Sequence, residues 1–150
     1  MNNIYTIGFT KKDAKTFFEL IKNNNITLVV DVRLNNTSQL AGFSKYPDIK
    51  YFLAKCAKCY YRSDKKFSPS EVTLDDYKKK RITWEEYVVQ FNDLMNERNI
   101  RKYIKEYYSE VLQKETICFL CSEETPENCH RRLVVEIFAE EFDLNIVHLI

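Results

Sequence analysis

Glycine is scarce in this chain. The sequence has only two glycines, Gly8 and Gly42, among its 150 residues. Neither a GxGxxG nor a GxxxxGK phosphate-binding loop can be written with two such distant glycines, so these nucleotide-binding motifs are excluded. The spacing from Cys56 to Arg62 matches the Cys-x5-Arg loop of cysteine phosphatases, but no glycine lies between them to let a loop wrap phosphate closely. Most turns must therefore be made by Asn, Asp, Ser and Pro.

Long apolar runs and a leader-like amino terminus are also missing. No apolar run approaches the roughly 18 residues of a membrane span, and residues 1–4 do not begin a basic region followed by an apolar one. The five cysteines are an odd number, which favours free thiols in a reducing compartment. We therefore expect a cytoplasmic protein with no membrane partner. Its length predicts one domain, residues 1–150, with a single buried core.

Charge is nearly balanced overall but unevenly distributed. The formal net charge is +1, yet residues 45–81 hold 11 Lys or Arg against 5 Asp or Glu, and residues 123–150 hold 2 basic against 7 acidic residues. The basic run from Lys78 to Arg81 has four tyrosines nearby in the sequence: Tyr60, Tyr61, Tyr77 and Tyr87. Such a segment could bind nucleic acid through phosphate contacts and base stacking. A solvated charged surface is the simpler interpretation, because dedicated nucleic-acid binders are usually strongly basic.

Hydrophobic periodicity predicts alternating strands and helices. Strands are predicted at 4–7, 26–32, 59–62, 116–120 and 145–149, and helices at 13–23, 48–58, 83–98, 100–113 and 133–142. Thr83 and Glu86 have the spacing of a capping box, and residues 63–81 are predicted to be irregular. The alternation is typical of an α/β fold. We expect a mainly parallel sheet of about five strands covered by helices, as in Rossmann-like and flavodoxin-like three-layer sandwiches.

Reactive side chains gather in residues 121–132, between a predicted strand and a predicted helix. The segment holds two thiols, Cys121 and Cys129, together with His130, Glu123 and Arg131. In an open α/β sheet, ligands bind at the carboxyl ends of the strands, and a helix start favours anions. A helix start and a neighbouring cation also favour a thiolate. We therefore predict a nucleophilic Cys129 beside His130.

Other interpretations of these groups stay open. Cys129 could be a buried and inert cysteine at a capped helix start. Cys121 and Cys129 could also form a redox dithiol, or half of a zinc site with His130 and Glu123. Against zinc, Cys118 and Cys121 lie three apart near a strand end and should point to opposite faces. No metal site is predicted.

Asp31 and Arg33 end the clearest buried strand. Because strand residues alternate between faces, these two side chains point to the same side. Burial of both charges is costly unless they are paired. They could face a shared crevice as a carboxylate and an anion-binding guanidinium, or they could form a structural ion pair that locks the edge of the sheet.

Several short motifs occur together in this chain. They are Tyr5-Thr6-Ile7-Gly8, Asp31-Val32-Arg33, Ser38 with Gly42-Phe43-Ser44-Lys45, Trp84-Glu85-Glu86-Tyr87, and Cys121-x-Glu123 to Cys129-His130-Arg131. In this order and spacing they resemble the family catalogued as domain of unknown function 488, over roughly residues 5–149. The resemblance implies a single compact α/β domain of prokaryotic type, and it implies no known activity.

The sequence thus predicts a pocket for an anion or a nucleotide phosphate at the carboxyl edge of the sheet, with catalysis left open. The residues expected to act in catalysis are Cys129, His130, Asp31 and Glu123. The residues expected to contact the substrate are Arg33, Arg131, Ser38 and Cys121. The expected partner is an anionic small molecule or nucleotide; a nucleic-acid module and a metal-held or redox-stabilised structural domain are the alternatives. Neither a cofactor nor an oligomeric state follows from the sequence.

Overall fold

A parallel sheet of five strands forms the centre of the molecule. The computed structural model describes residues 2–37 and 42–150. The strands are β1 (Asn3–Gly8), β2 (Leu28–Asp31), β3 (Tyr60–Ser63), β4 (Ile117–Cys121) and β5 (Asn145–Leu149). Their order in the sheet is β3-β2-β4-β1-β5, and every neighbouring pair is parallel. The predicted α/β fold with a parallel sheet is confirmed.

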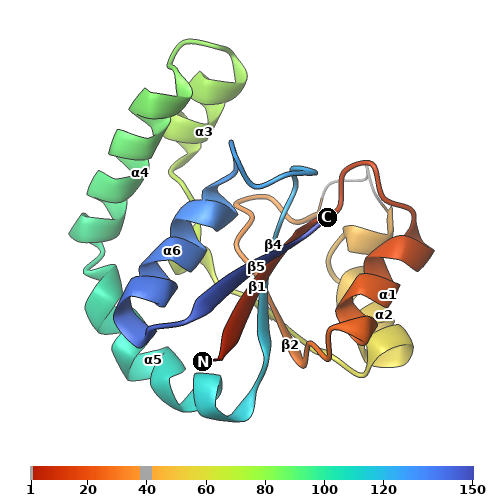
Figure 1. Ribbon diagram of the computed structural model, residues 1–150. Helices are drawn as coiled ribbons and strands as arrows, with labels where there is room; N and C mark the ends of the chain where they lie inside the picture. Colours follow the sequence, from red (N-terminus) through yellow and green to blue (C-terminus); the bar gives the residue numbers. More distant parts are fainter. Residues whose placement is uncertain (1, 38–41) are drawn as a thin grey trace.

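Helices cover both faces of this sheet, which gives three layers (Figure 1). The α-helices of the described residues are α1 (Ala14–Asn23), α2 (Asp48–Ala57), α3 (Glu71–Lys78), α4 (Trp84–Glu97), α5 (Ile100–Lys114) and α6 (His130–Phe142). Two short 3-10 helices are η1 (Gly42–Ser44) and η2 (Lys65–Phe67). Helices α1 and α2 lie on one side of the sheet, and α4, α5 and α6 lie on the other. Within the described residues, no helix has both the length and the apolar character needed to cross a membrane.

The sheet separates two clusters of buried side chains. Because successive strand residues face opposite sides, Val29 and Cys118 pack toward α1 and α2, whereas Val30, Phe119 and Cys121 pack toward α4 and α6. All five residues of β4 are buried, as expected for a central strand that is covered on both faces. The prediction that Cys118 and Cys121 face opposite sides is confirmed.

Local sequence signals explain where α1 and α4 begin. Asp13 caps α1, because its side chain accepts a hydrogen bond from the backbone N–H of Thr16 at 2.8 Å. The predicted capping box is confirmed at α4: the Thr83 hydroxyl accepts from the Glu86 N–H, and the Glu86 carboxylate accepts from the Thr83 N–H.

The prediction of an irregular segment at residues 63–81 is wrong, because it contains η2 and α3. Ser70 caps α3 by accepting a hydrogen bond from the Thr73 N–H. Helix α3 is so short and charged that hydrophobic periodicity did not reveal it. Phe67, within η2, packs edge-on against Phe119 and Phe138 and so joins the core. Tertiary packing therefore orders a segment whose own pattern is weak.

The strand order places a switch point between β1 and β4. From β1 the chain passes through α1 to β2, on the far side of β4. From β4 it passes through α6 to β5, on the far side of β1, so the two connections leave in opposite directions and over opposite faces. Gly8 and Cys121, the last residues of these strands, are register partners. A crevice for ligands is expected outside such a point.

Candidate functional site

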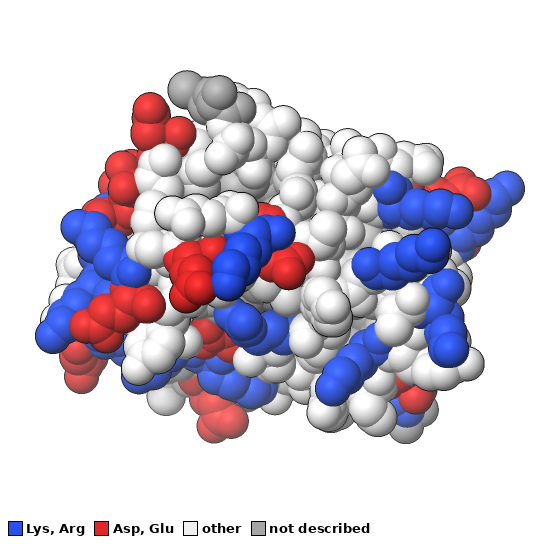
Figure 2. Space-filling model, turned by 90° about the horizontal axis from the view of Figure 1, so that it is seen from below, with Lys and Arg blue, Asp and Glu red and all other residues white. Residues whose placement is uncertain are grey.

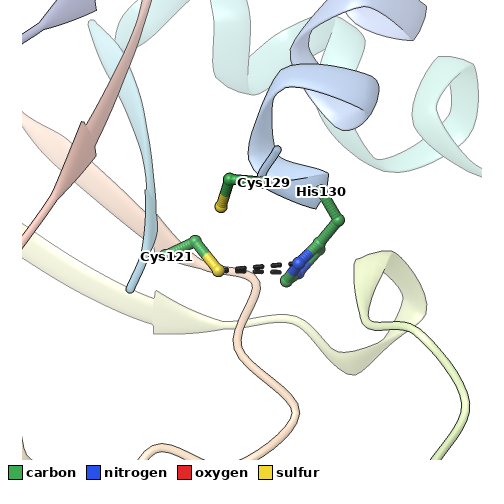
Figure 3. Close-up of side chains that lie close together, drawn as sticks. All are labelled: Cys121, Cys129 and His130. Carbon is green, nitrogen blue, oxygen red and sulfur yellow. Dashed lines mark hydrogen bonds between the residues drawn. The ribbon is translucent and has the colours of Figure 1, made fainter. Parts of the chain in front are cut away.

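Three reactive side chains meet at the carboxyl end of β4 (Figure 3). Cys121 ends the strand, Cys129 is the N-cap of α6, and His130 is the first residue of that helix. Their donor atoms all lie within 4.8 Å of one another, and the residues are only 5%, 3% and 6% exposed, respectively. Among the described residues they are the one group of three or more His, Cys, Asp or Glu side chains close enough to share a ligand. The sequence prediction placed all three at this edge.

The position of the histidine ring is fixed by the backbone of Val32, the residue that follows β2. Nε2 of His130 lies 2.7 Å from the carbonyl oxygen of Val32. A carbonyl oxygen can only accept a hydrogen bond, so Nε2 carries the proton and donates it. In the neutral ring Nδ1 is then an acceptor, and it lies 3.5 Å from Sγ of Cys121. The sulfur is also 3.9 Å from Nε2, so it lies almost as close to one ring nitrogen as to the other.

The two thiols of the cluster have pKa values shifted in opposite directions. A hydrogen bond from Cys129 lowers the pKa of Cys121, helped by the backbone N–H of Ser122 and the charge of Arg131. The pKa of Cys129 is raised because its thiol donates that hydrogen bond and because it is buried. The hydrogen-bond contacts of the described residues also place Cys121 next to the imidazole, with Sγ 3.5 Å from Nδ1 of His130, whereas the sequence prediction paired Cys129 with that ring.

Arg131 is a fully buried guanidinium that holds the loop between β4 and α6. Its Nη1 donates to the carbonyl oxygen of Glu123 at 2.6 Å, and Nη2 lies 3.5 Å from that of Glu124. Its Nε has no hydrogen-bond partner, and none of the ion pairs of the described residues includes it. Glu123 contributes its backbone carbonyl to this contact, while the residue itself is exposed and outside the cluster of three donors. A role for the Glu123 carboxylate as base or metal ligand therefore has no geometric support.

Gly8 allows this loop to lie against the end of β1. A Cβ atom on Gly8 would lie 1.6 Å from the carbonyl oxygen of Glu123 and 2.8 Å from Nη1 of Arg131. The two loops are also joined by Thr10, whose N–H and hydroxyl both donate to the carbonyl oxygen of Ser122. A side chain at position 8 would therefore displace the loop that carries the site.

Asp31 and Arg33 form a buried ion pair with both charges fully engaged. Nε and Nη2 of Arg33 donate to the two carboxylate oxygens at 2.9 and 2.8 Å, and Nη2 also donates to the carbonyl oxygen of Ser44. Tyr61 donates its hydroxyl to the same carboxylate at 2.6 Å. The geometry favours the structural ion pair of the two interpretations, because both carboxylate oxygens of Asp31 and the Nε and Nη2 donors of Arg33 are already in hydrogen bonds.

Other residues named from the sequence lie away from the cluster or outside the described residues. Ser38 is outside the described residues. Cys56 is exposed on α2, and Cys118 faces the opposite side of the sheet. Burial raises the pKa of Cys59 to about 12, which makes it an inert thiol. Neither the Val32 carbonyl nor the Tyr61 hydroxyl was singled out from the sequence for the site, because a backbone oxygen leaves no sequence signal and Tyr61 joins the site only through the pairing of β2 with β3.

The basic run from Lys78 to Arg81 has fewer unpaired charges than its sequence suggests. Lys79 and Arg81 form ion pairs with Asp75 and Asp76 of α3. Tyr87 is buried and stacks on Trp84, so it is not available to a base. Seen from below, Lys and Arg are interspersed with Asp and Glu on the left part of the molecule, whereas the charged side chains on the right part are mainly Lys and Arg (Figure 2). Nucleic-acid binding stays a prediction without support from these contacts.

Comparison with known protein families adds one finding. The model of the family described as Domain of unknown function DUF488 matches residues 13–138. The chain belongs to this family. Comparisons with curated proteins and with solved structures gave no match.

The part of the chain that matches DUF488 contains the cluster. It runs from the N-cap of α1 into α6 and so includes Cys121, Cys129, His130 and the Asp31–Arg33 pair. Gly8 precedes the matched residues, although its register partner Cys121 lies within them. The family is itself one of unknown function, so membership supports the fold and leaves the chemistry to the geometry of the site.

Proposed function

We propose that this DUF488 protein is a thiol-dependent enzyme that acts on a small anionic molecule at the carboxyl edge of the sheet. Cys121 is the nucleophile and His130 is its base. The hydrogen bond from His130 Nε2 to the Val32 carbonyl is the observation that carries the proposal. It leaves Nδ1 as the acceptor on the side of Cys121, which is the arrangement in which an oriented imidazole activates a thiol.

Two further groups favour the thiolate in this proposal. The nearby Cys129 thiol and the buried charge of Arg131 both lower the pKa of Cys121. Arg131 has no carboxylate partner among the described ion pairs, so a thiolate nearby partly offsets a buried positive charge. The proton of Cys121 passes to Nδ1, and the imidazolium keeps its Nε2 bond to Val32.

An anionic substrate is supported by two buried donor atoms of cationic side chains. Nε of Arg131 and Nζ of Lys12 are both without a hydrogen-bond partner in the described structure. Burial and then the charge of Arg131 lower the pKa of Lys12, while the charge of Glu124 acts in the opposite direction. A phosphate or carboxylate group bound there would satisfy both. Arg33 is not part of this proposal, because Asp31 and Ser44 already occupy its donors.

Access limits the size of the group that reacts. The three cluster residues are nearly buried, and the hollow of about 430 Å³ between α1 and α2 is lined by other residues. A substrate that reaches Cys121 must therefore be small or must displace part of the surrounding chain. The free thiols of the chain also fit a reducing cytoplasm, in line with the expected location.

The test is the pH dependence of alkylation at individual cysteines, followed by peptide mass spectrometry. We expect Cys121 to react as a thiolate at a lower pH than a free thiol, whose pKa is about 8.5. His130→Gln should move this profile to higher pH, and phosphate should slow the reaction in the wild-type protein. Exposed Cys56 serves as an internal reference for reagent quality. An unreactive Cys121 in a folded, metal-free protein would refute the proposal.

A bound metal ion is the alternative that the same geometry allows. Two thiols and an imidazole within 4.8 Å of one another are suitable donors for zinc, and a histidine ligand commonly donates its other N–H to a carbonyl. In that case alkylation of Cys121 appears only after a chelator is added. Metal analysis of the purified protein, compared with a Cys121→Ser variant, distinguishes the two outcomes.

A further inference from the structure

Cys129, the second thiol of the cluster, has no role in the chemistry proposed so far except to lower the pKa of Cys121. Cys129 lies at the N-cap of α6, where a side chain usually accepts a hydrogen bond from the first turn of the helix. Its side chain makes no such bond. Instead it points toward Cys121 (Figure 3), and its sulfur lies within 4.8 Å of the other donor atoms. Helix α6 therefore has no side-chain cap, and its N-cap residue places a second sulfur at the site instead.

The connection between the two cysteines suits a reversible cross-link. Both cysteines are free thiols, and residues 122–128 separate them in a single loop. No capping bond holds the Cys129 side chain, so a disulfide requires only that the two sulfurs, now within 4.8 Å, approach each other by side-chain rotation and movement of the loop. The helix itself is held by Arg131 and the core, so the movement stays local.

We propose that Cys121 and Cys129 form a dithiol–disulfide pair that reduces the disulfide of a small anionic thiol. This inference rests on the proposed nucleophile Cys121 and names the substrate class of the same site. Lys12 and Arg131, with their unpartnered donors, select a disulfide that carries carboxylate or phosphate groups.

The reaction has two steps that balance in atoms and electrons. The Cys121 thiolate attacks one sulfur of the substrate disulfide RS–SR, forms the mixed disulfide Cys121–S–SR and releases RS⁻. The imidazolium of His130, which holds the proton of Cys121, gives that proton to RS⁻ and becomes neutral again. Cys129 then loses its proton to the neutral ring of His130, attacks the Cys121 sulfur, forms the Cys121–Cys129 disulfide and releases the second RS⁻. The two protein thiols are oxidised, the substrate is reduced to two thiols, and their two protons come from Cys121 and Cys129. A reduced dithiol in solution returns the protein to its starting state.

The experiment uses oxidised glutathione as the anionic disulfide and bis(2-hydroxyethyl) disulfide as its neutral counterpart. Every protein carries Cys56→Ser, because exposed Cys56 would form its own adduct. Reactions are stopped with acid, remaining thiols are blocked with a maleimide, and the products are identified by intact and peptide mass spectrometry. The background protein should lose two hydrogens, form the Cys121–Cys129 disulfide and keep no glutathione.

Two variants separate the steps. Cys129→Ser should stop at a stable glutathione adduct on Cys121, and Cys121→Ser should abolish the fast reaction. Cys129→Ala provides the same test if the serine variant folds poorly, as judged by circular dichroism. Cys118→Ala, on the other face of the sheet, is the matched control and should behave like the background protein. Lys12→Gln should lower the rate of reaction with oxidised glutathione at least about fivefold more than the rate with the neutral disulfide. Lys11→Gln, which changes an exposed neighbouring residue, should lower the two rates equally or not at all.

The outcomes distinguish this inference from the proposed function. A lasting adduct on Cys121 in the background protein would overturn the dithiol pair and leave the nucleophile intact. Reaction of Cys121 with alkylating reagents but with neither disulfide would overturn the inference in the same way. Failure of Cys121 to react with any reagent would remove both proposals. Reaction with disulfides only after chelation would overturn both in favour of a metal site.

Discussion

Gly8 at the end of β1 and Asp31 at the end of β2 determine how closely the chain segments around the site pack together. Gly8 gives up a side chain so that the Glu123 carbonyl and the Arg131 guanidinium can reach the strand end. Asp31 uses both carboxylate oxygens to hold Arg33 and Tyr61. Neither residue touches a thiol in the hydrogen bonds of the described residues, yet each fixes a chain segment that contacts the cluster.

Replacement of Gly8 by alanine should destabilise the protein strongly. The added Cβ would overlap a backbone oxygen at 1.6 Å, so the loop from Ser122 to Asn128 must move. We expect a loss of about 3 kcal/mol in the free energy of unfolding by urea. Gly42→Ala is the control, because no atom lies within 4 Å of its Cβ position, and it should stay within about 0.5 kcal/mol of wild type. Equal effects of the two substitutions would contradict the close approach at Gly8.

Removal of the Tyr61 hydroxyl should weaken the ion pair of Asp31 and Arg33. The hydroxyl donates to a buried charged acceptor at 2.6 Å, and such hydrogen bonds contribute about 1.5–3 kcal/mol. We expect Tyr61→Phe to lose that much stability in chemical denaturation. Its neighbour Tyr60 is 71% exposed, so Tyr60→Phe should have almost no effect. A stable Tyr61→Phe protein would mean that water satisfies Asp31 equally well.

At the scale of elements, the edge of the sheet carries a titratable contact. Strand β5 pairs with β1, and this brings Nδ1 of His148 to 2.6 Å from the hydroxyl of Thr6. Burial, followed by the charges of Arg131 and Arg132, lowers the pKa of His148 below its usual 6.5. The pairing of β5 with β1 is thus coupled to protonation, although His148 lies outside the thiol cluster.

Acid should therefore weaken the folded state through His148. A lowered pKa means that the unfolded chain binds the proton more readily, so stability decreases as the pH falls below about 6.5. We expect the melting temperature of the wild type to drop between about pH 7 and about pH 5.5. His148→Gln cannot titrate, and its drop over the same range should be smaller. Identical pH profiles for the two proteins would show that His148 does not couple folding to pH.

For the whole molecule, one sheet joins two apolar clusters that lie on its opposite faces. Alternate residues of β2 and β4 belong to each cluster. Unfolding of these strands would therefore expose both clusters to water. The predicted single domain of residues 1–150 should then unfold as one unit.

A single cooperative transition is the measurable consequence. Trp84 is the only tryptophan and packs on the α4 side of the sheet, so its fluorescence reports one cluster. Circular dichroism in the far ultraviolet reports helices on both faces. We expect the two signals to give the same urea midpoint. An earlier loss of helix signal, before any change at Trp84, would indicate that the α1–α2 side unfolds separately.

The sequence by itself determined the fold class, most secondary-structure elements and the location of the candidate site. Apolar runs of strand and helix period, together with caps such as Thr83, are local signals, and the position of Cys121 between a strand and a helix follows from them. Only the tertiary structure decided which thiol pairs with His130, because the Val32 carbonyl that orients the ring comes from the segment after β2, far from His130 in the sequence. Packing likewise turned Arg33 from a candidate anion ligand into half of a buried pair. These outcomes depend on distances between segments far apart in the chain, which a one-dimensional pattern does not contain.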